Sequence, residues 1–198
     1  MALNTKLVSR IKPVIFISLI LPSILWLYQF INGNLGINPI DKLMDKLGEF
    51  ALQLIIATLL VSNLSKLQSF RSLQILRRMI GLFAFYYVVI HFITYIALDH
   101  FFNWQFIIKD VIKRPFITLG FVSFLLLIPL ASTSTNKITK KLTYKVWKNL
   151  HKLIYIVAPL ATLHYFLLTK ADKIEPILYF IIIFFIITWR VFLKFVKF

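Results

Sequence analysis

Six long apolar segments, separated by short polar stretches, dominate the chain. A helix that crosses a bilayer needs about 20 mostly apolar residues. The sixth segment is the most apolar, with the run FIIIFFIITW, whereas the second and fifth contain polar residues. Because the connections are short, the pattern predicts an all-α integral membrane six-helix bundle that forms a single domain over residues 1–198. The predicted spans are residues 13–31, 47–64, 80–98, 115–132, 150–168 and 176–193.

The composition supports a location in the membrane. Hydrophobic residues make up 60% of the chain, against about 45–50% in a typical soluble domain. The net charge of +16 could indicate a nucleic-acid-binding protein. We exclude this class because the basic residues lie between the apolar segments and not on one polar face. The chain has no cysteine, which excludes disulfides, iron–sulfur clusters and thiolate ligation of haem.

Charged residues are distributed unequally between the two ends of the predicted spans. The N-terminus, the second and fourth connections and the C-terminus carry basic residues and no acidic ones. Short cytoplasmic loops are enriched in Lys and Arg, so we expect both termini to lie in the cytoplasm. The third connection, residues 99–114, mixes aromatic and charged residues, and we expect it to lie in the outer interface. All seven acidic residues fall on the outer side: Asp41, Asp45, Glu49, Asp99, Asp110, Asp172 and Glu175.

Two histidines, and no acidic residue, lie deep within the predicted spans, which argues against a transporter built on intramembrane carboxylates. His91 lies roughly 16 Å and His164 roughly 21 Å from the cytoplasmic ends of the third and fifth spans. Two neutral imidazoles on facing helices at similar depth can supply both axial ligands of one haem iron. Such a six-coordinate site suits electron transfer. The alternative is a pair of structural histidines, each hydrogen-bonded to a neighbouring helix.

A second group of candidate residues lies at the cytoplasmic ends of the same spans. His151 lies roughly 20 Å from His164 along the helix axis and could ligate a second haem. It has no evident histidine partner, because Arg77 occupies the position fourteen residues before His91. Arg77 and Arg78 are candidates for pairing with a haem propionate or a flavin phosphate, or with lipid phosphate. His100 follows the third span, where a solvated loop histidine is the commoner role.

The chain contains no dinucleotide-binding fingerprint, no P-loop and no metalloprotease motif,. Nothing in it is expected to bind NAD(P)H, and we assign no catalytic residue. Electrons that enter from the cytoplasm would therefore have to come from another protein or from a quinone.

Three segments of the chain are distinctive in their order and spacing: RRMIGLFAFYYVVIHFITY (Arg77–Tyr95), KRPFITLGF (Lys113–Phe121) and VWKNLHKLIYIVAPLATLHY (Val146–Tyr165). They resemble the ferric-reductase-like transmembrane superfamily and, within it, the MsrQ family. MsrQ proteins are the haem-binding membrane subunits of the periplasmic methionine-sulfoxide reductase system. The resemblance covers nearly the whole chain. It implies a b-type haem at His91 and His164, with His151 as a further ligand position, and FMN as an additional cofactor.

The resemblance also implies partners and a location in the bacterial inner membrane. The partner would be a periplasmic molybdopterin-dependent reductase subunit of the MsrP type, in a heterodimer, and electrons would come from the quinone pool or a cytosolic flavin reductase. NADPH oxidases of the same superfamily carry a second histidine on the third helix, where this chain has Arg77. This departure does not favour a second haem, near the cytoplasmic side, with two histidine ligands.

We therefore expect an electron-transfer subunit that serves the repair of oxidised periplasmic proteins. One alternative is a self-standing ferric-reductase-type haem protein. Another is a non-redox membrane scaffold or transporter.

Overall fold

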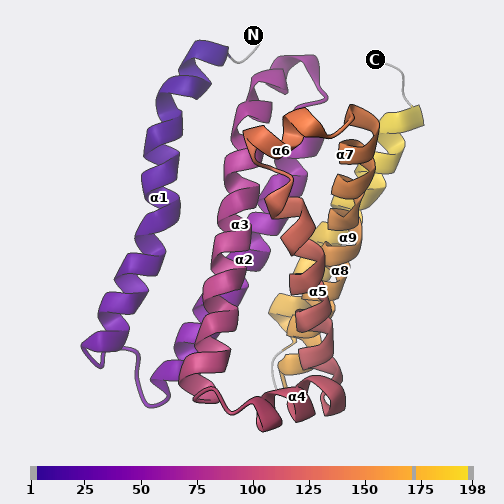
Figure 1. Cartoon of the computed structure of the whole chain (residues 1–198). Coiled ribbons are helices and arrows are strands. Elements are labelled where there is room, and N and C mark those ends of the chain that lie inside the picture. Colours follow the sequence, from indigo (N-terminus) through magenta and orange to yellow (C-terminus); the bar gives the residue numbers. More distant parts are fainter. Residues whose placement is uncertain (1–3, 171–172, 196–198) are drawn as a thin grey trace. The chain divides into compact units, whose positions relative to one another are not determined.

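The computed structural model describes residues 4–170 and 173–195, and almost all of these residues are helical (Figure 1). Asp172 of the predicted outer side lies outside the described residues. No strand occurs in the described ranges, which confirms the all-α prediction. The helices are α1 (Thr5–Ile31), α2 (Pro39–Leu64), η1 (Gln68–Leu73), α3 (Gln74–Thr94), η2 (Tyr95–Asp99), α4 (Trp104–Lys113), α5 (Pro115–Ser132), α6 (Asn136–Lys141), α7 (Tyr144–Leu150), η3 (His151–Leu153), α8 (Ile154–Leu168) and α9 (Ile174–Phe195).

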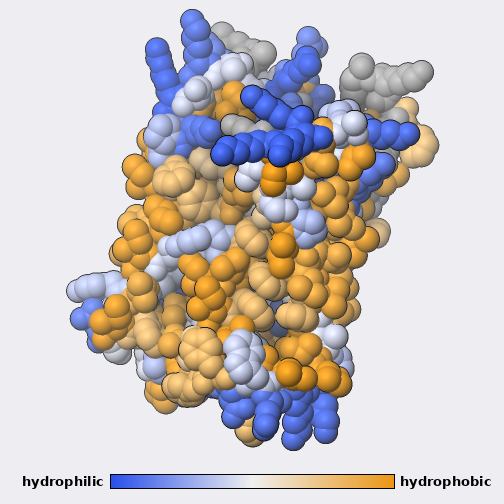
Figure 2. All heavy atoms as spheres, viewed as in Figure 1, coloured by the Kyte–Doolittle hydropathy of each residue, from blue (hydrophilic) through white to orange (hydrophobic). Residues whose placement is uncertain are grey.

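Six helical segments are long and apolar enough to cross a membrane, as predicted. The fourth has the predicted ends, whereas most of the others begin several residues before the apolar stretch. Hydropathy detects only the part of a helix that lies in hydrocarbon, and a helix can continue into the headgroup region where Lys and Arg are favourable. Figure 2 shows this division, with hydrophobic residues along the helices and hydrophilic residues at their ends. The segments are Thr5–Ile31, Pro39–Leu64, Gln68–Asp99, Pro115–Ser132, Tyr144–Leu168 and Ile174–Leu193.

The chain divides into two compact units, Met1–Ile107 and Ile108–Phe198. The first contains α1, α2 and α3, and the second contains α5 to α9. The prediction that residues 1–198 form one domain stays a prediction.

In the first unit, α2 packs along most of α3 (Figure 1). Leu47, Ile55 and Leu59 of α2 are almost completely buried, as is Tyr87 of α3. The ring of Tyr87 meets the ring of Phe50 edge-on at 4.8 Å between centroids. This apolar contact fixes the register of α3 against α2, since a shift of either helix would separate the two rings.

Tyr87 also enters the hydrogen-bond ladder of α1 next to Pro22. Its hydroxyl donates to the Leu19 carbonyl at 2.6 Å and accepts from the Ser23 amide at 3.2 Å. In a regular helix those two backbone groups bond to each other. Pro22 lacks an N–H and crowds the turn before it, which opens the ladder at this point. The tyrosine hydroxyl bridges the opening and joins α1 to α3.

In the second unit, α5 packs against α8, and α8 packs against α9. Val157, Ala158 and Thr162 of α8 have no exposed surface. The Thr162 hydroxyl donates to the Ala158 carbonyl within the same helix, so this buried polar group needs no partner on another helix,.

The predicted outer connection forms the short helix α4, which follows two unusual residues. Phe101 and Phe102 have φ angles of 46° and 59°, in the left-handed region that bulky residues rarely adopt,. Both side chains are exposed, as are Trp104 and Phe106 of α4. The connection thus contains a short helix with exposed aromatic side chains, and its position in the membrane interface stays a prediction.

Candidate functional site

His91 lies on α3 and is hydrogen-bonded to the neighbouring helix α2. Its Nδ1 atom lies 2.9 Å from the carbonyl oxygen of Met44. Because a carbonyl can only accept, Nδ1 must carry the hydrogen of the neutral ring. The lone pair of the imidazole is then on Nε2, the atom that a metal would bind.

The close approach of the His91 ring to α2 depends on Gly48, which lies one helical turn after Met44. A Cβ atom built on Gly48 would lie 3.0 Å from Cε1 and 3.1 Å from Nδ1 of His91. Carbon atoms in van der Waals contact are usually about 3.5–4.0 Å apart. Any residue larger than glycine would therefore have to displace the imidazole.

His164 is held in the same way in the second unit. Its Nδ1 atom donates to the Phe116 carbonyl of α5 at 2.6 Å. A Cβ atom on Gly120, again one turn after the carbonyl, would lie 3.0 Å from both Cε1 and Nδ1 of His164. We call these sets the first histidine cradle (Met44, Gly48, His91) and the second histidine cradle (Phe116, Gly120, His164).

The two cradles are repeats of one arrangement, although they belong to different units. In each, a helix supplies a carbonyl and, four residues later, a glycine, and a following helix supplies the histidine. The signal in the sequence is short: Leu-Gly occurs at Leu47 and Leu119, and both histidines lie between an aliphatic and an aromatic residue. Sequence analysis missed Met44, Gly48, Phe116 and Gly120, because so short a match does not stand out within apolar helices.

A hydrogen bond through Nδ1 fits both roles that the sequence allows for these histidines. A structural histidine would use the bond to join two helices. A metal-ligating histidine also commonly donates its second N–H to a carbonyl, which fixes the tautomer and the orientation of the ring. Each histidine, taken within its own unit, therefore has the tautomer that a haem-iron ligand needs,.

His151 has a different environment from the two cradle histidines. It begins η3, and its Nδ1 atom lies 3.1 Å from the Trp147 carbonyl of its own chain segment. Its Nε2 atom lies 3.4 Å from the Ser134 hydroxyl, and its ring lies 4.2 Å from that of Trp147. Both ring nitrogens thus have polar neighbours within the second unit. No glycine lies against this ring.

Arg77 and Arg78 lie in the first turns of α3, fourteen and thirteen residues before His91. At 1.5 Å per residue this places them about 20 Å from His91 along the helix. They are therefore not part of the first histidine cradle. Arg78 occupies the position in α3 that His151 occupies before His164, since each precedes its histidine by thirteen residues.

His100 is less solvated than its loop position predicts. Its side chain is 19% exposed and lies 3.6 Å from the carboxylate of Asp99. The ring also meets that of Tyr95 edge-on at 4.5 Å.

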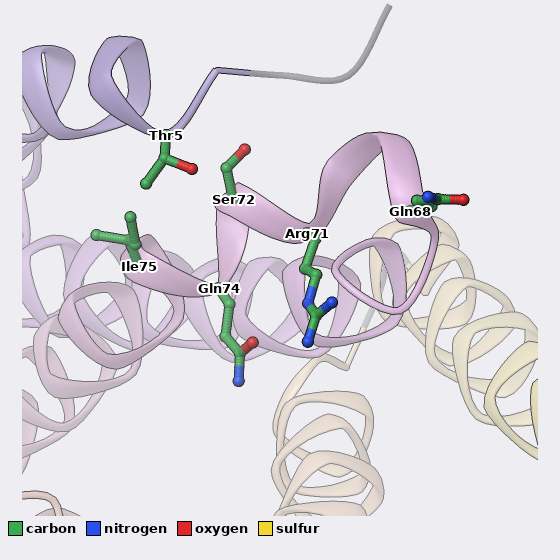
Figure 3. A pocket seen from close by; sticks show the side chains of 6 residues that line it. All are labelled: Thr5, Gln68, Arg71, Ser72, Gln74 and Ile75. Carbon is green, nitrogen blue, oxygen red and sulfur yellow. The ribbon is translucent and has the colours of Figure 1, made fainter.

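A polar pocket of about 540 Å³ lies where the N-terminus of α1 meets η1 and the start of α3. In Figure 3, Thr5 faces Ser72 and Ile75, while Arg71 and Gln74 extend to the other side of the same segment. The Ser72 hydroxyl is buried and makes no hydrogen bond within the described residues. The pocket lies at the end of α3 that carries Arg77 and Arg78, and sequence analysis did not predict it. Its lining residues are Thr5, Gln68, Arg71, Ser72, Gln74 and Ile75.

Comparison with known proteins identifies the family. Residues 46–162 match the family described as the ferric reductase like transmembrane component, a range that includes His91 and His151 and ends just before His164. The chain is 45% identical over 159 residues to the protein-methionine-sulfoxide reductase heme-binding subunit MsrQ of Caulobacter vibrioides, covering 80% of this chain and 76% of the relative. It is 42% identical over 184 residues to MsrQ of Herminiimonas arsenicoxydans, covering 92% of this chain and 84% of the relative.

A longer relative shares the same region. The chain is 40% identical over 175 residues to the magnetosome protein MamZ of Magnetospirillum gryphiswaldense, which covers 85% of this chain and 27% of MamZ. The six apolar helices agree with the transmembrane family, so the protein is a multi-pass membrane protein. The chain belongs to the ferric-reductase-like transmembrane family and, within it, to the MsrQ family of bacterial membrane proteins.

Proposed function

We propose that this protein is the haem-containing electron-transfer subunit of a methionine-sulfoxide reductase system and not its catalytic subunit. Its relatives carry the name of heme-binding subunits of such reductases. In this function it takes electrons from the quinone pool or a cytosolic flavin reductase. It passes them to a periplasmic molybdopterin-dependent subunit of the MsrP type, which repairs oxidised periplasmic proteins. The observation that carries the proposal is the pair of matching histidine cradles.

In this proposal, His91 and His164 are the two axial ligands of one b-type haem iron. Each imidazole bears its hydrogen on Nδ1, bonded to a backbone carbonyl. Each therefore offers the Nε2 lone pair as an iron ligand. A haem held by these two residues would supply one-electron redox chemistry.

Residues beside each proposed ligand on the same helix are buried in the helix packing. Tyr87 and Thr94, four residues before and three after His91, are 0% and 4% exposed. Thr162, two residues before His164, is 0% exposed. These buried neighbours and the backbone hydrogen bonds of the two imidazoles hold the rings in fixed positions, as a pre-organised ligand site would require,.

We propose that electrons enter the protein at the cytoplasmic ends of the same helices. FMN is proposed here as a second cofactor, on the family resemblance, with Arg77 and Arg78 as partners for its phosphate or for a haem propionate. His151 remains a candidate ligand of a second haem. That role would require Nε2 to give up its neighbour Ser134.

The proposed topology places both termini in the cytoplasm of a bacterial inner-membrane protein. In that orientation α2 and α5 each begin at the periplasmic side. Met44 and Phe116 lie near the beginnings of these helices. The cradles would then lie nearer to the periplasm, where the partner accepts electrons.

A reconstitution experiment tests this function. The purified protein is incorporated in liposomes with a quinol, and the oxidised periplasmic reductase is added with a methionine-sulfoxide substrate. We expect a haem spectrum that is reduced by quinol and reoxidised by the partner, with sulfoxide turnover. His91→Ala should abolish both reoxidation and turnover. A protein without a haem spectrum, or a haem that the partner never reoxidises, would overturn the proposal.

A second candidate function is reduction of external ferric iron, which the matching family description suggests. The same liposomes distinguish the two functions. A ferric reductase should reduce a ferric chelate outside the vesicles at a comparable rate with or without the partner. An electron-transfer subunit should turn over quickly only when the partner is present.

A further inference from the structure

We infer that Gly48 and Gly120 are positioning residues that hold the two histidine rings onto their backbone carbonyls and thereby lower the reduction potential of the iron. This inference rests on the proposed function, in which His91 and His164 ligate haem iron. It assigns control of the reduction potential to two glycines that lie against the imidazole rings.

The first step is steric. A methyl group at Gly48 would lie within 3.1 Å of two atoms of His91, and one at Gly120 would lie within 3.0 Å of two atoms of His164. In both cases one of the two atoms is Nδ1, which makes the hydrogen bond to the carbonyl. The ring must therefore shift by a few tenths of an ångström to accommodate the methyl group, and the shift displaces the atom that makes the hydrogen bond.

The other glycines of the chain show that this contact is specific. A Cβ atom on Gly81, in the interior of α3, would meet only Thr58 at 3.5 Å, an ordinary contact. Gly33 and Gly36 have φ angles of 70° and 91° and serve the turn between α1 and α2. The two helical glycines that cannot accept a methyl group without a shift are therefore the two that face histidines.

The second step is electronic. A hydrogen bond from Nδ1–H to a carbonyl moves electron density toward Nε2 and makes the imidazole a stronger donor. A stronger donor favours ferric over ferrous iron, so it lowers the reduction potential. The His164 bond, at 2.6 Å, is shorter than the His91 bond, at 2.9 Å. The second cradle should therefore contribute more to this effect than the first.

Alanine substitution separates this role from a role in folding. Alanine favours an α-helix more than glycine does, so Gly48→Ala and Gly120→Ala should not weaken α2 or α5 themselves. Gly81→Ala is the matched control, because it makes the same change at a helical site without a histidine.

The experiment compares the haem-loaded wild type with the three alanine variants. We expect Gly120→Ala to shift the ferric–ferrous equilibrium toward ferrous haem by on the order of tenfold, which corresponds to about 59 mV for one electron. Gly48→Ala should shift it less, and Gly81→Ala should not shift it. Electron paramagnetic resonance of the ferric state should show altered g-values in the two cradle variants only. Potentials and g-values equal to those of Gly81→Ala would overturn the inference.

A measurement without haem keeps the inference testable if a variant loses the cofactor or if the wild type never binds it. Nitrogen NMR of ¹⁵N-histidine-labelled, haem-free protein reports which ring nitrogen carries the hydrogen. Gly48→Ala should change the tautomer balance of His91 and leave that of His164 unchanged, and Gly120→Ala should do the reverse. Unchanged signals would overturn the positioning role. A wild type without haem but with the expected NMR response would refute the proposed function and leave the steric role standing.

Discussion

The hydroxyl of Tyr87 donates a 2.6 Å hydrogen bond to the carbonyl oxygen of Leu19 and so lies inside the ladder of another helix. The Tyr87 hydroxyl oxygen also accepts a hydrogen bond from the Ser23 amide. One side chain thus satisfies two backbone groups that Pro22 has separated. Tyr87 lies one helical turn before His91. The connection between α1 and α3 is therefore made close to the first histidine cradle.

Removal of this hydroxyl should destabilise the first unit. Tyr87→Phe keeps the ring but leaves the Leu19 carbonyl and the Ser23 amide without their bridge, at a cost of about 1–3 kcal/mol for each buried group. Tyr86→Phe is the control, since the Tyr86 hydroxyl bonds to a Ser23 hydroxyl that already donates to the Ile20 carbonyl and bridges no backbone groups within the described residues. Thermal unfolding in detergent, monitored by circular dichroism, measures the loss of stability in each variant. Equal losses of stability in the two variants would mean that the Leu19 carbonyl and the Ser23 amide bond to each other when the Tyr87 hydroxyl is absent.

The variants His91→Ala and His164→Ala should have the same effect on haem. If the two side chains ligate one iron, removal of either should leave five-coordinate or lost haem, and the double variant should be little worse than either single one, because the ligands act as a unit. Haem content per protein and low-temperature reduced spectra measure this. Additive losses, or a normal six-coordinate spectrum in His164→Ala, would contradict ligation of a shared iron.

His151→Ala should leave the spectrum of the haem proposed at His91 and His164 largely intact. Thirteen residues separate His151 from His164, which is about 20 Å along a helix, and its nitrogens contact Trp147 and Ser134. We expect slower reduction from the cytoplasmic side if it serves an inner haem or a flavin. Ser134→Ala is the companion variant, because it removes the hydroxyl beside Nε2 and keeps the ring. Loss of the same spectral component as in His91→Ala would refute this assignment.

Reporter fusions test the topology. Alkaline phosphatase folds only outside the cytoplasm, so a fusion after Gly36, between α1 and α2, should be active. A fusion after Thr135, between α5 and α6, should be inactive. The opposite pattern would invert the orientation and would place the cradles near the cytoplasm.

The sequence predicts the helices and the cradle histidines for a clear physical reason. A spanning helix needs a long apolar run, and His91 and His164 are conspicuous because a polar side chain is costly there. The helix ends were predicted less well, because α2 begins at Pro39 and continues through charged residues that hydropathy assigns to a loop. Two histidines at similar depth on separate spans already suggested a haem, and the family resemblance added its b type and FMN as a second cofactor.

The partners of these histidines could not be predicted, because they have no side-chain signature. Met44 and Phe116 contribute backbone carbonyls, and any residue could occupy their positions. Only Gly48 and Gly120 leave a trace in the sequence, and an isolated glycine in a helix has many explanations. The insertion of Tyr87 into α1 was equally hidden, since its partner Leu19 is 68 residues away.

The use of a backbone carbonyl as the partner of each imidazole has a consequence for acid tolerance. A carboxylate partner takes up a proton at low pH and then ceases to be a strong acceptor. The carbonyls of Met44 and Phe116 have no charge to lose and remain acceptors wherever their helices persist. The hydrogen-bond acceptor of each imidazole should thus be independent of the acidity of the surrounding compartment.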